Sequence, residues 1–264
     1  MIPFFTIPPL KILGLEFHAF GLLVAIGFFA ATQLAMLRAK NLKLSQEIVS
    51  DASLIAIIFG IFGAHLFHVF FYEPELLKNP INLLKFWSGL SSYGGIITVT
   101  IALVVFLKRK NKPVLPYVDM LFFGGCLGFF FGRMGCFIAH DHPGNLSDFF
   151  LAVQFPGGAR HDLGFYEMLL WLFIFIVMLI KTNKTKKKPA FWGQDSLIVL
   201  SLYAPGRFFL EFLRAQDTGL SFMPDARYFG LTPAHYVSLT ACVFCLLAWG
   251  YVFFKKPYSH QLKS

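Results

Sequence analysis

Long apolar runs recur along the whole chain and are separated by short polar segments. Each run is close to the ~20 residues that an α-helix needs to cross the hydrocarbon core of a bilayer. Backbone groups in lipid must be hydrogen-bonded within their own segment, so runs of this kind form helices. The sequence therefore predicts an all-α membrane protein with a single domain over residues 1–264. The seven predicted spans are residues 17–37, 52–72, 93–107, 117–138, 164–180, 195–213 and 234–254.

The charge content agrees with this class and excludes a soluble protein. Only 14% of the residues are charged and 56% are hydrophobic, whereas a soluble domain carries about 25% charged residues. The formal net charge of +9 would indicate nucleic acid binding in a soluble protein. Here the basic residues have a topological explanation, so we expect no nucleic acid partner.

The positions of lysine and arginine predict the orientation. Of the 23 basic residues, 15 lie in the first, third and fifth loops and in the C-terminal tail, and six lie on the other side. Basic residues accumulate on the cytoplasmic side of a membrane. We therefore predict an extracytoplasmic N-terminus and a cytoplasmic C-terminus. The remaining two basic residues, Arg133 and Arg207, lie inside predicted spans.

Three polar loops then fall on the outer side, at residues 73–92, 140–163 and 215–233. The first two are rich in aromatic residues, proline and glycine and poor in lysine, so we interpret them as covers over a site. The third span is short. We expect its start, residues 91–95, to enter the membrane as irregular backbone that lines a cavity.

Arg133 follows an uncharged apolar stretch, and an arginine at such a depth costs roughly 2.5–3.5 kcal/mol on insertion scales. Its own helix offers no acid within one turn. Arg207 is the second such charge; Tyr203, Arg207 and Glu211 have i, i+4, i+8 spacing and share one helix face. Glu211 can pair with Arg207 or Arg214, which is the alternative of a self-neutralised ion pair.

Because Arg133 lacks an evident counter-ion, we interpret the two arginines as partners for one shared anion. A guanidinium group suits phosphate or carboxylate by bidentate hydrogen bonding. A phospholipid head group is the natural anion near the outer face of a membrane. The sequence therefore predicts a phospholipid site at Arg133 and Arg207.

Histidines near Arg133 are candidates for proton transfer or for metal binding. His140 and His142 flank Asp141, and His161 precedes the fifth span. A histidine near its usual pKa, or a carboxylate beside it, can accept a proton from a thiol or hydroxyl. Zinc held by these histidines is the alternative. We favour a general base, with His140 first and His142 or Asp141 next.

Three motifs resemble the prolipoprotein diacylglyceryl transferase family, and the resemblance extends over nearly the whole chain. They are Gly-Arg-Met-Gly at residues 132–135, Tyr166-Glu167 at the start of the fifth span, and a set around the sixth span comprising Tyr203, Arg207, Glu211, Arg214 and Asp217. The resemblance implies transfer of the diacylglyceryl group of phosphatidylglycerol to the lipobox cysteine of a prolipoprotein. It places this transferase at the outer face of the bacterial cytoplasmic (inner) membrane, and it implies no metal and no other cofactor.

The resemblance and the chemistry of the residues together suggest roles for individual residues. The partners are membrane lipid and the signal peptides of prolipoproteins. The residues expected to act in catalysis are Arg133, Arg207, His140, Asp141 and Tyr203. The residues expected to bind substrate are Arg133, Arg207, Tyr93, Gly94, Gly144, Glu211, Arg214 and His142. Tyr203 and Glu211 are expected to position Arg207.

Four positions depart from the family pattern. Tyr93 replaces a histidine, Cys136 an asparagine, Phe20 a tyrosine and His65 an arginine. A tyrosine with its usual pKa of about 10 is a poor proton acceptor. Two alternatives therefore stay open. One is a non-catalytic phospholipid-binding or transport protein, and the other is a zinc-dependent membrane hydrolase that uses His140, His142 and His161.

Overall fold

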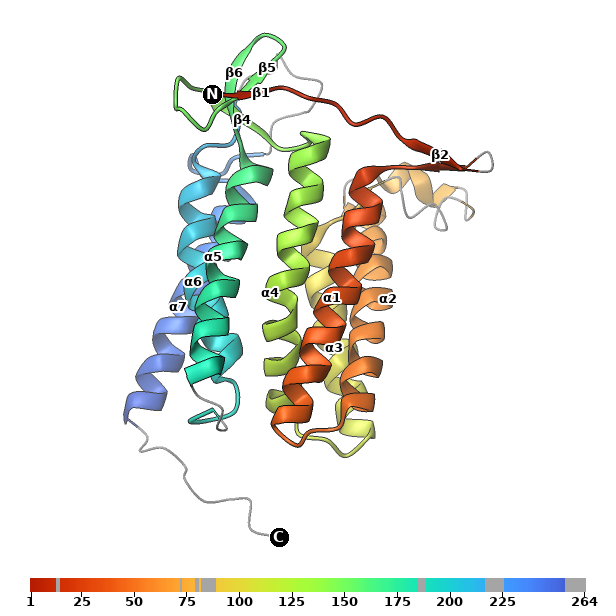
Figure 1. The fold of residues 1–264 in the computed structure, drawn as a ribbon, viewed down its shortest axis with the longest axis vertical. Helices are drawn as coiled ribbons and strands as arrows, with labels where there is room; N and C mark the ends of the chain where they lie inside the picture. The colour runs from red at the N-terminus through yellow and green to blue at the C-terminus, as the bar shows by residue number, and fades with distance from the viewer. Residues whose placement is uncertain are drawn as a thin grey trace. The chain divides into compact units, whose positions relative to one another are not determined.

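The computed structural model describes residues 1–12, 15–71, 73–78, 81, 89–184, 189–216 and 226–254. Over these residues the chain forms seven α-helices, a short 3₁₀ helix and six short strands (Figure 1). The helices are α1 (Ala19–Asn41), α2 (Gln46–Phe71), α3 (Ser92–Arg109), α4 (Val114–Ala139), α5 (Leu163–Lys184), α6 (Gln194–Glu211) and α7 (Pro233–Phe254). Each predicted span coincides with one helix.

Six of the seven helices have the length and hydropathy of a membrane span: α1 to α5 and α7. Many of their large apolar side chains point outward, including Leu22, Phe129 and Leu246. Such exposure suits lipid and would be unfavourable in water. The exception is α6, which includes the charged residues Asp195, Arg207 and Glu211. The acidic side chains of α6 lie in the protein interior, because Asp195 and Glu211 are fully buried.

The prediction of irregular backbone at residues 91–95 is wrong. Ser91 is the N-cap of α3, and the helix begins at Ser92. Gly94 and Gly95, which suggested irregular backbone, allow close packing of two helices instead. A Cβ atom on Gly95 would lie 3.1 Å from the carbonyl oxygen of Gly60 in α2. The glycines let the backbones of α2 and α3 approach each other.

The chain divides into two compact units. One consists of residues 35–121 and is built mainly from α2 and α3, which pack along their length. The other consists of residues 1–34 and 122–264. In the second unit the buried core lies among α4, α5 and α6. Its members are Phe123, Cys126, Trp171, Ile174, Met178 and Val199.

Small residues also bring α1 and α4 together in the second unit. A Cβ atom on Gly27 would lie 2.9 Å from the carbonyl oxygen of Gly128, and one on Gly128 would lie 3.0 Å from the Cβ atom of Ala31. Contacts this short leave no room for a larger side chain without a shift of the helices. The pair Gly27 and Gly128 therefore fixes the distance between the two helices.

A purely α-helical fold was predicted, and this is wrong in one respect. The segment between α4 and α5 folds into strands, which the N-terminus joins. The four-stranded sheet has the order β1 (Ile2–Pro3), β5 (Val153–Phe155), β6 (Gly158–Asp162) and β4 (Pro143–Leu146). β1 pairs with β5 in parallel, and the other pairs are antiparallel. A separate hairpin joins β2 (Leu10–Ile12) to β3 (Leu15–Phe17).

The sheet matters for the site because β4 follows the end of α4 and β6 leads directly into α5. It therefore caps the ends of the two helices that carry Arg133 and Glu167 (Figure 1). Short strands of two to five residues have little signal in a sequence, because pairing with distant segments stabilises them and local preference contributes little.

Candidate functional site

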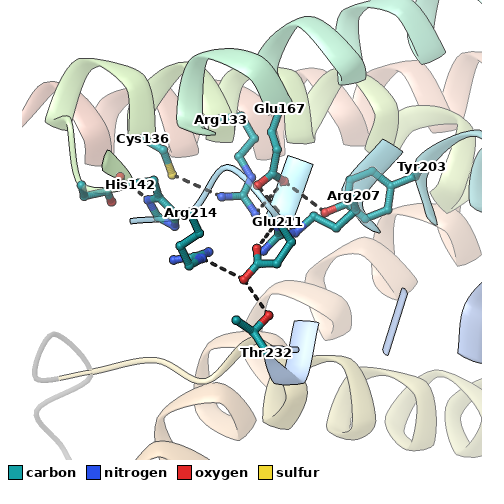
Figure 2. A network of polar contacts seen from close by, with 10 residues as sticks. Arg133, Cys136, His142, Glu167, Tyr203, Arg207, Glu211, Arg214 and Thr232 are labelled. Carbon is teal, nitrogen blue, oxygen red and sulfur yellow. Dashed lines mark hydrogen bonds and ion pairs between the residues drawn. The ribbon is translucent and has the colours of Figure 1, made fainter. Parts of the chain in front are cut away.

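Charged side chains from three helices meet inside the second unit (Figure 2). Arg133 comes from α4, Glu167 from α5, and Arg207 and Glu211 from α6. Both glutamates are completely buried. Buried charges persist only when they are paired, and here each carboxylate has more than one cationic partner. The cluster is therefore held as a unit by interactions between helices.

Arg133 has a counter-ion within the chain. Its Nη2 atom lies 3.0 Å from Oε2 of Glu167. The interpretation that Arg133 lacks such a partner is therefore wrong. Glu167 lies in the first turns of α5, 34 positions further along the chain. Sequence spacing on one helix could not indicate the pair, although a lone acid in an apolar helix was an available signal.

The predicted face of α6 is confirmed by the contacts that its residues make. The Tyr203 hydroxyl donates a hydrogen bond to Oε2 of Glu167 at 3.1 Å. Nε of Arg207 lies 3.7 Å from Oε1 of Glu167, and Nη1 of Arg207 pairs with Glu211. The helix continues through Pro205 without a break. Tyr203 and Arg207 therefore reach the same carboxylate that holds Arg133.

Glu211 extends the cluster towards α7. Its Oε1 atom lies 2.9 Å from Nε of Arg214 and accepts a hydrogen bond of 2.8 Å from the Thr232 hydroxyl. Thr232 directly precedes α7, and its backbone N–H donates to Nδ1 of His235 at 3.2 Å. A side chain three residues into a helix that accepts from the N-cap amide forms half of a capping box. The start of α7 thus orients Glu211.

We expect Thr232→Val to lower the free energy of unfolding by about 1–3 kcal/mol, because the buried Oε1 atom of Glu211 loses one of its two donors and keeps only Arg214. Thermal unfolding of the purified protein in lipid nanodiscs measures this. The matched control is Thr240→Val within α7, where the hydroxyl donates to the carbonyl of Tyr236 at an exposed position. Equal effects of the two substitutions would contradict a specific role for Thr232.

Three arginines and two glutamates form the ion pairs of this cluster. Three guanidinium groups, those of Arg133, Arg207 and Arg214, pair with two carboxylates, those of Glu167 and Glu211. Arg133 lies six residues before the end of α4, which is about 9 Å along the axis. The cluster is therefore near one end of the helices.

A second group of polar residues lies beside Arg133. Nη1 of Arg133 is 3.9 Å from Sγ of Cys136. The donor atoms of Cys136, Asp141 and His142 all lie within 4.8 Å of one another. Nδ1 of His142 is 2.5 Å from Oδ1 of Asp141. The structure thus brings the cysteine that departs from the family pattern next to the predicted Asp141 and His142. Figure 2 shows Cys136 and His142 of this group.

His140, the first choice as general base, lies in a different environment. It is buried, and its Nδ1 atom lies 2.9 Å from Oδ2 of the buried Asp162. Its ring stacks on Phe4 at 4.7 Å and contacts Phe5 and Phe155 edge-on. With φ of 49° it ends α4 in the left-handed conformation. This geometry supports a structural role, in which His140 joins α4 to the sheet.

His161 is also separate from the charged cluster. Nδ1 of His161 lies 2.8 Å from the hydroxyl of Tyr166. Burial lowers the pKa of His161, so its imidazole is neutral at pH 7. Both residues line an apolar cavity of about 400 Å³. Since His140, His142 and His161 each pair with a different residue, the three-histidine zinc site of the hydrolase alternative is not formed in the described structure.

Gly144 allows two backbone segments to lie close together. It forms a bridge with Arg214, and the neighbouring Asn145 amide donates to the carbonyl of Leu213 at 2.7 Å. The carbonyl oxygen of Gly144 accepts a hydrogen bond of 3.1 Å from Arg160. A Cβ atom at this position would collide with the Leu213 carbonyl and with His161. The glycine thus lets β4 lie against the chain that follows α6.

The remaining predicted residues lie in other parts of the structure. Tyr93 and Gly94 belong to the first turn of α3, in the unit of residues 35–121, and their part in substrate binding stays a prediction. His65 lies in the same unit, with Nδ1 3.1 Å from the carbonyl of Gly89. Phe20 packs near Gly135, at the start of α1. Asp217 lies outside the described residues.

The fold and the site together define a class: a helical membrane protein with a buried arginine–glutamate cluster. A family model described as prolipoprotein diacylglyceryl transferase matches residues 9–251, and the chain belongs to this family. Two relatives have the name phosphatidylglycerol–prolipoprotein diacylglyceryl transferase. The Agrobacterium fabrum protein is 31% identical over 243 residues, which cover 84% of this chain and 85% of that protein. The Rhizobium leguminosarum bv. trifolii protein is 30% identical over 241 residues, covering 84% of both.

Proposed function

We propose that this protein transfers the diacylglyceryl group of phosphatidylglycerol to the cysteine thiol of a prolipoprotein. Membership of the transferase family supports the reaction. The single observation that carries the assignment of the site is the arginine cluster, in which Arg133 and Arg207 converge on the buried carboxylate of Glu167. The natural anion for such a group in a membrane is the phosphodiester of a lipid.

The chemistry of the transfer explains why two arginines are useful. A thiolate attacks the glycerol carbon that bears the phosphate, a C–S bond forms and the C–O bond breaks. The electron pair of that bond leaves on the phosphate oxygen, so the phosphodiester monoanion becomes glycerol phosphate with two negative charges. Groups that are aimed at developing charge act on the transition state. Arg133 and Arg207 would stabilise the added charge more than they stabilise the bound lipid.

The buried carboxylates would keep the two arginines in place before lipid binds. Glu167 contacts Arg133, Arg207 and the Tyr203 hydroxyl. Glu211 pairs with Arg207 and is itself held by Thr232. A group fixed by its neighbours loses little entropy and needs little reorganisation when charge develops. Tyr203 and Glu211 thus act by positioning, as the resemblance implies.

We further propose that the chain crosses the bacterial cytoplasmic membrane seven times with its N-terminus outside. The distribution of lysine and arginine among the loops supports this orientation. α6 would be the seventh crossing, tolerated despite its charges because Asp195, Arg207 and Glu211 are paired within the bundle. The ends of α4 and α6 that carry the arginines would then face outward, where prolipoproteins are exposed.

The test is an assay with phosphatidylglycerol vesicles and a synthetic peptide that contains one lipobox cysteine. We expect the full-length protein in nanodiscs to add a diacylglyceryl group to the peptide, detected by mass spectrometry, and to release glycerol phosphate. A peptide with serine at the acceptor position should remain unmodified. Binding of phosphatidylglycerol without any peptide modification would contradict the transferase and favour the non-catalytic lipid-binding alternative.

A further inference from the structure

A histidine–carboxylate pair lies beside the arginine cluster. Nδ1 of His142 is 2.5 Å from Oδ1 of Asp141. One side-chain atom from each of His142, Asp141 and Cys136 lies within 4.8 Å of the other two. Sγ of Cys136 is in turn 3.9 Å from Nη1 of Arg133 (Figure 2). The pair is therefore one side chain away from an arginine that would hold the lipid phosphate.

We propose that His142, oriented by Asp141, is the general base that takes the proton from the thiol of the acceptor cysteine. This inference rests on the proposed function, because that reaction needs a thiolate. A base acts when it reaches the proton that it removes, directly or through one water molecule. A nucleophile, a histidine and a carboxylate in series form the triad of many hydrolases. Here the substrate would supply the nucleophile, and the chain supplies the other two groups.

The contact with Asp141 decides which nitrogen of His142 is available. An ionised carboxylate only accepts hydrogen bonds, so Nδ1 bears the hydrogen and donates it to Asp141. In the neutral ring, Nε2 then has the lone pair. Within the part of the chain that the structure describes, His142 uses Nδ1 and leaves Nε2 without a hydrogen bond. Nε2 is thus free to accept a proton, and Asp141 would stabilise the imidazolium that forms.

Exposure separates this pair from the acids of the cluster and from the neighbouring histidine. The side chains of His142 and Asp141 are 26% and 36% exposed. Glu167 and Glu211 are completely buried and paired with arginines. His140 is buried and enclosed by aromatic rings. An incoming peptide can therefore reach His142, whereas the other three groups are covered.

The backbone of His142 is fixed to the start of α5. Its carbonyl oxygen accepts a hydrogen bond of 3.0 Å from the N–H of Leu163, and the next residue, Pro143, begins β4. Glu167, which holds Arg133 at 3.0 Å, lies about one turn further along α5. One helix therefore positions both the base and the arginine. Groups that are held in this way lose little entropy when the reaction begins.

The position of the pair suits the displacement. Nε2 of His142 takes the proton of the acceptor S–H group, and the electron pair of that bond forms the C–S bond to the glycerol carbon. The C–O bond breaks and its electron pair leaves on glycerol phosphate, after which the imidazolium releases its proton to water. An in-line attack places the thiol on the far side of the glycerol carbon from the phosphate. A base one side chain away from Arg133 fits this geometry, because Arg133 would hold the phosphate.

Kinetics of the full-length protein in phosphatidylglycerol nanodiscs test the base. We expect His142→Gln to lower kcat for the cysteine peptide by about 10²–10⁴-fold, the usual contribution of a general base, with KM for lipid near the wild-type value. Asp141→Asn should lower kcat less, and the double variant should match His142→Gln, because residues that act as a unit are not additive. The controls are His18→Gln and Asp148→Asn at exposed positions, which should transfer at the wild-type rate.

A peptide with selenocysteine at the acceptor position separates proton transfer from a structural role. A selenol is largely ionised at neutral pH and needs no base, so the deficit of His142→Gln should shrink to less than about tenfold with this peptide. Asp141→Asn should be rescued in the same way. An equal deficit with both peptides, or a wild-type kcat of His142→Gln with the cysteine peptide, would overturn this inference and leave the transferase standing. If the wild type modifies neither peptide, the proposed function itself fails.

Discussion

Arg207→Lys is expected to lower the rate of diacylglyceryl transfer by about 10²–10³-fold, the loss that follows removal of one donor from an oxyanion-stabilising group. Lysine keeps the positive charge but loses the planar fork with which arginine engages two partners. Arg207 uses that fork to contact Glu167 through Nε and Glu211 through Nη1. The measurement is kcat for the lipobox peptide with saturating phosphatidylglycerol in nanodiscs. Arg133→Lys should have an effect of similar size.

Arg227→Lys is the matched control for this substitution. Arg227 lies outside the cluster, and its Nη1 atom donates to the carbonyl of Gly230 at an exposed position. We expect unchanged transfer in this variant. The decisive comparison is between kcat and KM, because a residue that acts mainly on developing charge affects kcat. An Arg207→Lys protein with wild-type kcat and only a raised KM for lipid would contradict the proposed role in the transition state.

Glu167→Gln should have the largest effect on stability. Glu167 is fully buried and contacts Arg133, Arg207 and Tyr203. Removal of one partner from a buried ion pair costs about 3–5 kcal/mol, because the remaining charge stays uncompensated. Glutamine has nearly the same volume, so the loss reports charge rather than packing. We expect a clearly lower unfolding temperature in nanodiscs of neutral lipid.

Anionic lipid should partly rescue this variant. Without the Glu167 carboxylate, Arg133 and Arg207 retain only Glu211 among the carboxylates of the cluster, so a phosphodiester has more charge to neutralise. We expect phosphatidylglycerol to raise the unfolding temperature more in Glu167→Gln than in the wild type. Glu16→Gln is the control, since Glu16 is exposed and pairs with the exposed Lys11 at 2.8 Å. A stability equal to that of the wild type in neutral lipid would show that Glu167 does not compensate the arginines.

Much of the helical architecture was predictable. Each predicted span coincides with a helix, because an apolar run of about 20 residues has few other stable conformations in a membrane. The face of α6 that carries Tyr203, Arg207 and Glu211 was also predictable, since the periodicity of a helix fixes it. The family motifs around Arg133 and Arg207 indicated the transferase family, to which the chain belongs. Local sequence was sufficient for these features because each depends on one helix at a time.

Other features depended on contacts between distant segments. The pairing of Arg133 with Glu167 joins two helices, and no spacing rule connects them. The sheet forms because β1 at the N-terminus pairs with β5 more than 140 residues later. In the sequence, His140 is the type of residue that acts as a general base. In the structure, aromatic rings from three segments enclose it. Its environment, which decides its role, was invisible in the sequence.

The sequence by itself determined the class of protein, the positions of the helices and the two arginines that lie inside predicted spans, because apolar length and the cost of buried charge are properties of single segments. Only the tertiary structure decided which acid compensates Arg133, that Thr232 orients Glu211, and that Cys136 lies beside Asp141 and His142. These arrangements follow from the packing of α4, α5, α6 and the sheet. Packing brings together groups whose separation along the chain carries no information about their distance in space.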